Sequence, residues 1–362
     1  MKRESSIPPV DYRAFSKRVH ESVRRDRIPV GGSIDLTSRC NLRCVHCYVR
    51  DASPDEELGT EDIKRILDEL ADAGCLWLLF TGGEPLIRKD FRELYGYAKQ
   101  KGFLVNLFTN ATLVTPEIAD FLGGWPPFSI EISIYGATRE TYEKVTGVKG
   151  SFDRCMAGID LLHRKGLPLK LKSMILTLNQ HELSGMMDIA EKLGAEFRYD
   201  PNIHGRVDGS RSPVSFRLSP EEVLQLDFID RRRIGALKKY VDYCKQYDRD
   251  DVHAFHCGAG IDSFHIDSRG RLCLCMLARR ESFDLAQGSF TEGWDGLIKE
   301  MRFRKNDRPY NCGVCELLEM CGQCPGWGEV ENGDQLQAAE FLCRLAHLRQ
   351  EAYEKLSEWN EK

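Results

Sequence analysis

Short apolar runs alternate with amphipathic segments between residue 33 and about residue 200 of this 362-residue chain. The runs have the length of strands, and the segments between most of them space their apolar residues three or four positions apart, as helices do. Repeated strand–helix units predict a parallel sheet with right-handed crossovers. The expected strands lie at residues 33–37, 76–80, 104–109, 128–134, 169–175 and 196–200.

The helical pattern is clearest before the second expected strand. Ile63, Ile66, Leu67 and Leu70 follow helical spacing, and Gly74 stands where a glycine would end the helix. Six strand–helix units are two short of a closed eight-unit barrel. The expected fold class is therefore α/β, a partial (β/α)6 TIM barrel with its functional residues in the loops that follow the strands.

The pattern changes towards the C-terminus. Glycine and cysteine become frequent after Cys257 and the periodicity fades, as expected where metals take over the role of a hydrophobic core. A small cysteine-rich C-terminal domain is therefore expected after the barrel. The expected organisation is an N-terminal extension at 1–30, the barrel at 31–205, a bridging region at 206–256, the cysteine-rich domain at 257–345 and a helical tail at 346–362.

Composition narrows the function. A formal net charge of −5 argues against a nucleic-acid partner. The N-terminal residues lack the apolar core of a signal peptide, and no apolar run is long enough to span a membrane, so a cytoplasmic protein without a membrane partner is expected. The chain has 14 cysteines. Because the cytosol keeps thiols reduced, metal binding explains them better than disulfides do.

Three of these cysteines, Cys40, Cys44 and Cys47, directly follow the first expected strand. Three thiolates can hold three irons of a four-iron cluster and leave the fourth iron open to an outside ligand. A catalytic zinc with three protein ligands, His46 being near in sequence, is the alternative.

The C-x3-C-x2-C spacing resembles that of the radical S-adenosylmethionine (SAM) superfamily. The second strand ends in Thr81-Gly82-Gly83-Glu84-Pro85, which is similar to the GGEP motif of that superfamily. The resemblance implies that SAM chelates the open iron of a [4Fe–4S] cluster. It also implies reductive cleavage of SAM to a 5′-deoxyadenosyl radical, which abstracts hydrogen from a substrate. Glycines let the backbone approach the methionine amino group, for which Glu84 is an anionic acceptor.

Further SAM contacts follow from the same resemblance. Ser133 matches a ribose or carboxylate contact, and Lys172 is placed to meet the SAM carboxylate. His46 occupies the position of an aromatic residue whose backbone approaches the adenine, and is expected to stack or shield. No residue is assigned as a catalytic acid or base. The expected SAM-binding residues are Gly82, Gly83, Glu84, Pro85, Ser133, Lys172 and His46.

Eight further cysteines lie in the C-terminal region, and their spacing resembles the SPASM domain, which holds two auxiliary [4Fe–4S] clusters. The resemblance implies three clusters in all. It assigns Cys257, Cys275 and Cys324 to the nearer auxiliary cluster, either with Cys273 as fourth ligand or with an open site. It assigns Cys312, Cys315, Cys321 and Cys343 to the distal one.

Several features qualify this assignment. Cys321 and Cys324 are spaced C-x2-C where the family has C-x3-C, and "GAGID" follows Cys257 without a further cysteine. A pair of structural zinc ribbons is the alternative. A hairpin turning at 267–270 is expected to deliver Cys273 and Cys275 on one face. The remaining cysteines are expected to be buried thiols: Cys75, Cys155 and Cys244.

The combination implies oxidative modification of a peptide or protein side chain, as a crosslink, a thioether or a side-chain oxidation. The expected partners are the peptide or small-molecule substrate and an external electron donor of the flavodoxin or ferredoxin type. Only about 30 residues precede the first strand. A separate peptide-recognition protein, or a substrate without a leader, is therefore expected.

Two other functions are weighed. Modification of a tetrapyrrole side chain in a haem pathway would need basic residues at the barrel mouth, for which the candidates are Arg88, Arg198, Arg206 and Arg211. A ferredoxin-like electron carrier is disfavoured, because a pure carrier gains nothing from an open iron.

Overall fold

The structure is a computed structural model that describes residues 11–49, 57–229, 235 and 250–360. Its framework is a nine-stranded sheet in the order β6-β5-β4-β3-β2-β1-β7-β8-β9. The six strands from β1 to β6 are all parallel and follow one another in sequence order. They are β1 (Gly31–Thr37), β2 (Trp77–Gly82), β3 (Leu104–Thr109), β4 (Ser129–Ser133), β5 (Leu169–Met174) and β6 (Glu196–Asp200).

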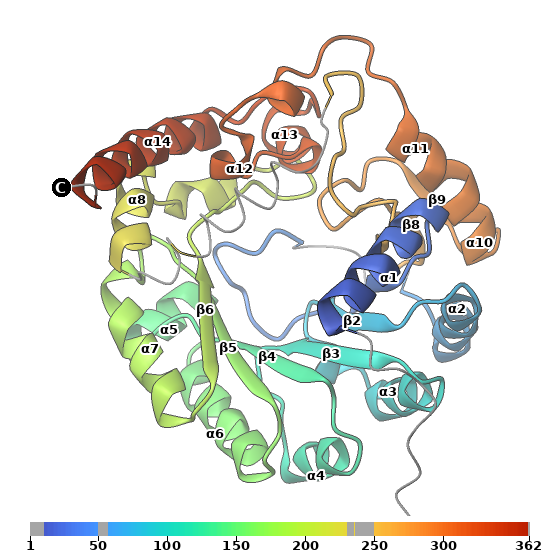
Figure 1. Cartoon of the computed structure of the whole chain (residues 1–362). Helices are drawn as coiled ribbons and strands as arrows, with labels where there is room; N and C mark the ends of the chain where they lie inside the picture. The colour runs from blue at the N-terminus through green and yellow to red at the C-terminus, as the bar shows by residue number, and fades with distance from the viewer. Residues whose placement is uncertain (1–10, 50–56, 230–234, 236–249, 361–362) are drawn as a thin grey trace, which may run out of the picture.

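Helices follow the strands and lie around the outside of their arc (Figure 1). One face of each helix is apolar and packs on the sheet; in α2 the buried residues are Ile63, Ile66, Leu67 and Leu70. This arrangement confirms the partial (β/α)6 barrel. The helices are α2 (Thr60–Asp72), α3 (Phe91–Gln100), α4 (Pro116–Gly124), α5 (Arg139–Thr146), α6 (Ser151–Arg164) and α7 (Leu183–Lys192).

The inner face of the barrel is polar. Successive side chains of a strand point to opposite faces. On β5, Leu169 and Leu171 are buried under the helices, while Lys170 and Lys172 face inwards and are partly exposed. Polar side chains therefore line the interior at the carboxyl ends of the strands, which is where (β/α) barrels place their sites.

The C-terminal region continues the barrel sheet. β7 (Ser263–Ile266) pairs in parallel with β1, from Gly31 opposite Ser263 to Ile34 opposite Ile266. β8 (Arg271–Cys273) and β9 (Ser282–Asp284) follow it antiparallel. Sequence periodicity did not predict this pairing, because it joins segments more than 200 residues apart.

The hairpin between β7 and β8 turns at Gly270, whose φ of +80° suits glycine, as expected. The prediction that the hairpin delivers both of its cysteines on one strand face is wrong. β8 ends at Cys273, and Cys275 lies in the bend that follows. The bend forms because the Ala278 amide turns back and donates to the Cys275 sulfur at 3.3 Å.

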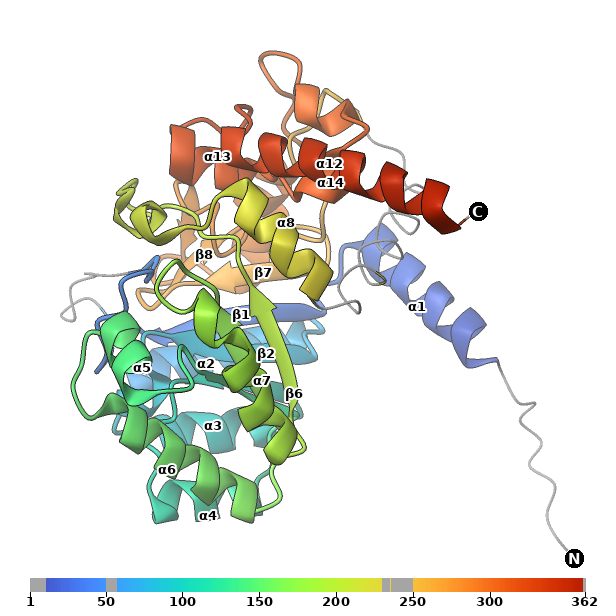
Figure 2. The ribbon, with the colours of Figure 1, turned by 90° about the vertical axis from the view of Figure 1, so that its left-hand side faces the viewer.

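The remaining helices belong mainly to the C-terminal region. Helix α1 extends away from the rest of the molecule (Figure 2). The long helix α14 packs on α8 and α12. The bounds are α1 (Tyr12–Asp26), α8 (Pro220–Ile229), α10 (Phe290–Gly293), α11 (Lys299–Phe303), α12 (Leu318–Cys321), α13 (Pro325–Asn332) and α14 (Glu340–Asn360).

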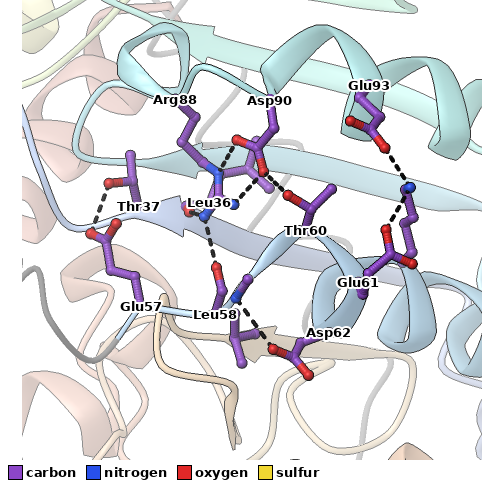
Figure 3. A network of polar contacts seen from close by, with 12 residues as sticks. Leu36, Thr37, Glu57, Leu58, Thr60, Glu61, Asp62, Arg88, Asp90 and Glu93 are labelled. Atoms are coloured by element: carbon purple, nitrogen blue, oxygen red, sulfur yellow. Dashed lines mark hydrogen bonds and ion pairs between the residues drawn. The ribbon is translucent and has the colours of Figure 1, made fainter.

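Arg88 has a structural role. Its guanidinium forms two hydrogen bonds with the Asp90 carboxylate, at 2.9 and 2.6 Å. It also donates to the carbonyls of Leu36 and Leu58, at 2.9 and 3.0 Å (Figure 3). Because these contacts bury Arg88 and use its donors, the structure removes Arg88 from the basic residues considered for the barrel mouth.

Two of the three cysteines expected to be buried thiols, Cys75 and Cys155, are buried. The third, Cys244, lies outside the described residues. Within the part of the chain that the structure describes, no helix is long and apolar enough to cross a membrane.

Candidate active site at the barrel mouth

The loop that carries Cys40, Cys44 and Cys47 leaves the carboxyl end of β1 and is anchored there by Glu57. One Glu57 carboxylate oxygen accepts hydrogen bonds from the Ser38 amide at 2.7 Å and from the Ser38 and Thr37 hydroxyls, both at 2.8 Å. Burial raises the pKa of Glu57, but these donors outweigh it and hold the pKa below its usual value. A carboxylate charge thus fixes the start of the cysteine loop.

The glycines after β2 allow close backbone contact with this loop. The Gly83 amide donates to the Thr37 carbonyl at 2.7 Å, and the Glu84 amide donates to the Arg39 carbonyl at 2.9 Å. A Cβ on Gly83 would lie 2.1 Å from the Arg39 carbonyl oxygen, and Gly82 has a φ of +119°. Both positions therefore require glycine. The GGEP segment and the cysteine loop form one backbone unit.

The loop after β3 supports the cysteine loop from another side. Asn110 donates to the Asn41 side chain at 3.0 Å, and Asn41 donates to the Thr112 hydroxyl at 2.7 Å. The Asn110 side-chain nitrogen, Nδ2, also lies 3.9 Å from the Cys40 sulfur. Four segments that follow four different strands thus meet at the barrel mouth, since the Arg43 amide also donates to the Thr146 carbonyl at the end of α5.

All three thiols of the loop lie close enough to Tyr135, just after β4, to affect its hydroxyl. Burial raises the pKa of the Tyr135 hydroxyl, and the charges of Cys44, Cys47 and Cys40 raise it further. The Leu42 amide donates to the Cys40 sulfur at 3.4 Å, a contact that tunes the sulfurs of iron–sulfur ligands. Within the described residues, no three His, Cys, Asp or Glu side chains are close enough to close a metal site as they stand.

The donor set nevertheless suits an iron–sulfur cluster. The sulfurs are soft ligands with amide donors beside them, on a loop fixed by the contacts above. They do not suit a closed structural zinc site, which needs four ligands. The nearest imidazole, His46, makes an edge-to-face contact with Tyr135 at 4.6 Å, and burial lowers its pKa to about 4.

Glu84 is fully buried. Its carboxylate accepts hydrogen bonds from the Thr109 hydroxyl and the Asn110 backbone amide, both at 2.7 Å, and from the Leu86 backbone amide at 3.1 Å. Burial raises its pKa to about 7, although these donors oppose the shift. The carboxylate ties the end of β2 to the end of β3. An ionised carboxylate has about four acceptor positions, so three donors leave one free.

The other residues expected to bind SAM lie along the same rim. Pro85 begins the short helix η2 (Pro85–Ile87), and Ser133 is the last residue of β4. Lys172 on β5 lies inside the barrel, over the Phe108 ring and 3.8 Å from the Glu131 carboxylate. Arg198 of β6 pairs with the same carboxylate.

The C-terminal cysteines form two groups. Cys324 precedes α13 and accepts a hydrogen bond from the Trp327 amide at 3.4 Å. Burial raises the Cys324 pKa to about 11, and the nearby thiols of Cys275 and Cys257 add to the shift. These three thiols, contributed by three separate segments, therefore lie near one another.

The second group lies among the C-terminal helices. Burial raises the pKa of Cys321 to about 12, and the neighbouring thiols of Cys343, Cys312 and Cys315 raise it further. The Gln323 amide donates to the Cys321 sulfur at 3.2 Å. Burial raises the pKa of Tyr310, and thiols of both groups, Cys312, Cys324 and Cys321, raise it further, so the two groups adjoin and the division of ligands suggested by the sequence stays a prediction.

Cys273 is the last residue of β8. Its thiol donates to the Arg271 carbonyl at 3.5 Å. Burial raises its pKa to about 12, and the charged neighbours that also affect it are Asp267, Arg279, Arg271 and Asp35, none of them a cysteine.

The sequence interpretation overlooked Glu57, Asn110 and Tyr135. Asn110 and Tyr135 lie directly after the third and fourth strands, and this position at the carboxyl edge was the available signal. Glu57 gave no such signal, because its partners at the start of the cysteine loop lie 18 to 20 positions earlier in the chain.

Comparisons with known proteins agree with this geometry. The sequence profile of the radical SAM superfamily matches residues 34–193. The chain is 34% identical to mycofactocin maturase MftC of Mycolicibacterium smegmatis over 320 residues, covering 82% of this chain and 77% of the maturase. It is 28% identical to the AdoMet-dependent heme synthase of Methanosarcina barkeri over 328 residues, covering 85% of this chain and 94% of the synthase.

Solved structures share the fold. Streptococcus suis SuiB bound to S-adenosylmethionine matches with a TM-score of 0.67 at 16% identity, over 94% of this chain and 83% of SuiB. AdoMet-bound anSMEcpe matches with a TM-score of 0.65 at 15% identity, over 92% of this chain and all of that chain. The identity to MftC and its coverage extend the superfamily match beyond the barrel. The chain therefore belongs to the radical SAM superfamily and is an enzyme that uses S-adenosylmethionine and an iron–sulfur cluster.

Proposed function

We propose that the chain oxidatively modifies a peptide or protein side chain, forming a crosslink or a thioether or oxidising the side chain. One observation carries this proposal: the segment of Cys275 follows β8 in the sheet that continues from β1, and its Arg279 donates to Asp35 of β1, the strand that leads into the triad loop. The similarity to MftC, named a maturase, supports it, as does the match to SuiB solved with its precursor peptide SuiA at a TM-score of 0.68.

In this proposal Cys40, Cys44 and Cys47 hold the [4Fe–4S] cluster that binds SAM. Gly82 and Gly83 bring their backbone against the loop, and Glu84 fixes the ends of β2 and β3 around it. When bound, the cluster and SAM supply hydrogen-atom abstraction, while the barrel orients the substrate and excludes water. SAM contacts are proposed for these motif residues together with Pro85, Ser133, Lys172 and His46.

We also propose that the C-terminal region is a SPASM domain with two auxiliary [4Fe–4S] clusters. Cys312, Cys315, Cys321 and Cys343 would close one of them. Cys257, Cys275 and Cys324 would hold the other, either with Cys273 as the fourth ligand or with one iron left to a different ligand. An external electron donor of the flavodoxin or ferredoxin type, and a separate peptide-recognition protein, complete the proposed partners.

The second candidate function is side-chain modification of a haem-pathway tetrapyrrole. It is favoured by the heme synthase relative, 94% of which the chain covers. Lys172 and Arg198 share one carboxylate, Glu131, inside the barrel. Burial lowers the pKa of Lys172 well below its usual value, so Arg198 is the side chain of this cluster that would pair with a carboxylate-bearing substrate.

The deciding experiment supplies reconstituted protein with dithionite, SAM and either a candidate peptide or a carboxylated porphyrin. Peptide modification predicts 5′-deoxyadenosine together with a peptide that has lost two hydrogen atoms. Loss of carbon dioxide from the porphyrin, with the peptide unchanged, would establish the second function instead. The control is the protein with Cys40, Cys44 and Cys47 changed to alanine, which should form no 5′-deoxyadenosine.

A further inference from the structure

A buried charged cluster lies between the triad loop and the C-terminal thiols. The Asp35 carboxylate on β1 is 3% exposed and accepts a hydrogen bond from Arg279 at 3.0 Å. His265 of β7, which is fully buried, lies 3.3 Å from the same oxygen and contacts the Ser33 hydroxyl at 2.8 Å. Because a buried charge is costly without its partner, Asp35 holds the Arg279 guanidinium in place.

Arg279 links this cluster to both cysteine regions. It follows Cys275 by four positions, and its Nε donates to the Met276 carbonyl at 2.6 Å, which fixes it to the bend that carries Cys275. Its guanidinium also lies 6.0 Å from the centre of the ring of Tyr48, the residue directly after Cys47.

A second set of contacts connects Tyr48 to the same C-terminal group. Tyr48 meets His204 edge to face at 5.7 Å, and His204 meets Trp327 in the same way at 5.2 Å. The Trp327 amide in turn donates to the Cys324 sulfur. Tyr48 is therefore the point where the segments carrying Cys275 and Cys324 both reach the triad loop.

We propose that Arg279, held by Asp35, is a positioning residue that fixes Tyr48 and thereby the loop segment of Cys47, so that SAM binding at the triad depends on the Cys275 bend. Arg279 acts through Tyr48 and touches no reacting atom. The inference deepens the proposed function and rests on its SAM-cleaving part, whatever the substrate is.

The first test is Arg279→Gln, which keeps most of the side-chain length and removes the charge. The apparent KM for SAM in reductive cleavage without peptide should rise about tenfold, on the scale of one lost charge-assisted hydrogen bond, while kcat changes less. The EPR spectrum of the reduced protein should also respond differently to added SAM, at unchanged iron content. The matched control is Arg280→Gln, because Arg280 is adjacent and exposed and donates to the Gly333 carbonyl at 3.3 Å.

Tyr48→Leu removes the ring beside the Arg279 guanidinium and should raise the KM for SAM in the same direction. In the double variant the two effects should not multiply, because both remove one interaction. A KM for Arg279→Gln equal to that of Arg280→Gln, or an increase of about a hundredfold in the double variant, would overturn the proposal. If Arg279→Gln fails to fold, an unchanged KM in Tyr48→Leu overturns the proposal alone.

These measurements need no peptide. If the wild-type protein cleaves SAM but modifies no peptide, the proposed function is wrong. The variants would still decide whether Arg279 positions the triad loop.

Discussion

At the residue scale, Glu84 accepts three hydrogen bonds within its own chain, so its substitution should act on structure as well as on the proposed SAM contact. Glu84→Gln keeps the side-chain volume. It replaces one carboxylate oxygen, which accepts a hydrogen bond from the chain, with an NH2 group that cannot accept it. We expect the free energy of unfolding to fall by about 1–3 kcal/mol. Chemical denaturation of the cluster-free protein measures this.

The effect of a Glu84 substitution on SAM cleavage is measured separately. Glu84→Ala should diminish the formation of 5′-deoxyadenosine in the reconstituted enzyme, because it removes the tie between β2 and β3 as well as the acidic group. Undiminished cleavage would contradict the role proposed for Glu84.

The Arg88–Asp90 pair predicts a pH dependence of stability. Hydrogen bonding from Arg88 lowers the pKa of Asp90 to about 2, from an ordinary value of 3.8. Because the folded-state pKa is the lower one, the pair stabilises the fold above about pH 4 and loses this contribution as the pH falls towards about 2. Asp90 is partly exposed, so solvent screening limits the contribution to about 1 kcal/mol.

Asp90→Asn tests this prediction. The free energy of unfolding of the cluster-free wild type should exceed that of the variant by about 1 kcal/mol near neutral pH, and the difference should shrink below about pH 4. A difference that stays constant down to about pH 2 would contradict the assignment of the shift to Asp90.

Individual side-chain roles were the hardest feature to predict from sequence. Arg88 was considered for the barrel mouth because it follows the GGEP segment. Its actual acceptors are a carboxylate two positions away and two carbonyls on other segments. The role of Glu57 was not predicted, because no recognisable motif lies beside it in the sequence. Only the folded backbone brings such partners together.

At the element scale, the contact between β2 and the cysteine loop depends on the absence of a side chain at Gly83. Gly83→Ala would push a methyl group into the Arg39 carbonyl, which is backbone and cannot move aside cheaply. We expect the iron held by the triad, about four atoms per protein, to be lost together with SAM cleavage.

Gly96→Ala is the matched control. Gly96 lies inside α3 with open space around its Cα, so alanine should stabilise the helix by about 0.5–1 kcal/mol and leave iron content unchanged. Iron analysis and thermal unfolding of the two variants measure the contrast. Full iron content in Gly83→Ala would show that the close approach is dispensable.

Strands and helices of the barrel were predictable because their signal is local. The third and sixth strands lie at the residues that apolar runs indicated, and the glycine after α2 adopts the expected positive φ. The pairing of β7 with β1 was not predictable in this way, because nothing in the four-residue sequence of β7 indicates which strand it pairs with. The bend at Cys275 was not predicted either. There the hydrogen bond from the Ala278 amide to the Cys275 sulfur turns the chain, where side-chain alternation alone would have continued the strand.

At the scale of the whole molecule, the three-cluster proposal predicts iron stoichiometry. Reconstituted wild type should bind about twelve irons, and the protein with Cys40, Cys44 and Cys47 changed to alanine about eight. The loss should be confined to the triad, because the C-terminal thiols are held by their own segments. Iron and sulfide analysis measures both proteins, and a variant that retains twelve irons would contradict the model of three clusters.

The pairing of β1 with β7 has a consequence for biosynthesis. β1 is among the first parts of the barrel to leave the ribosome, yet the strand that covers its outer edge begins at Ser263, 232 residues after Gly31. During that interval β1 presents unpaired backbone groups, and contacts so distant in sequence form slowly. Asp35 and Arg279 meet only after the same delay. The cysteine loop can thus attain its final contacts only after Arg279 has been synthesised, so the order of synthesis itself postpones the maturation of this loop.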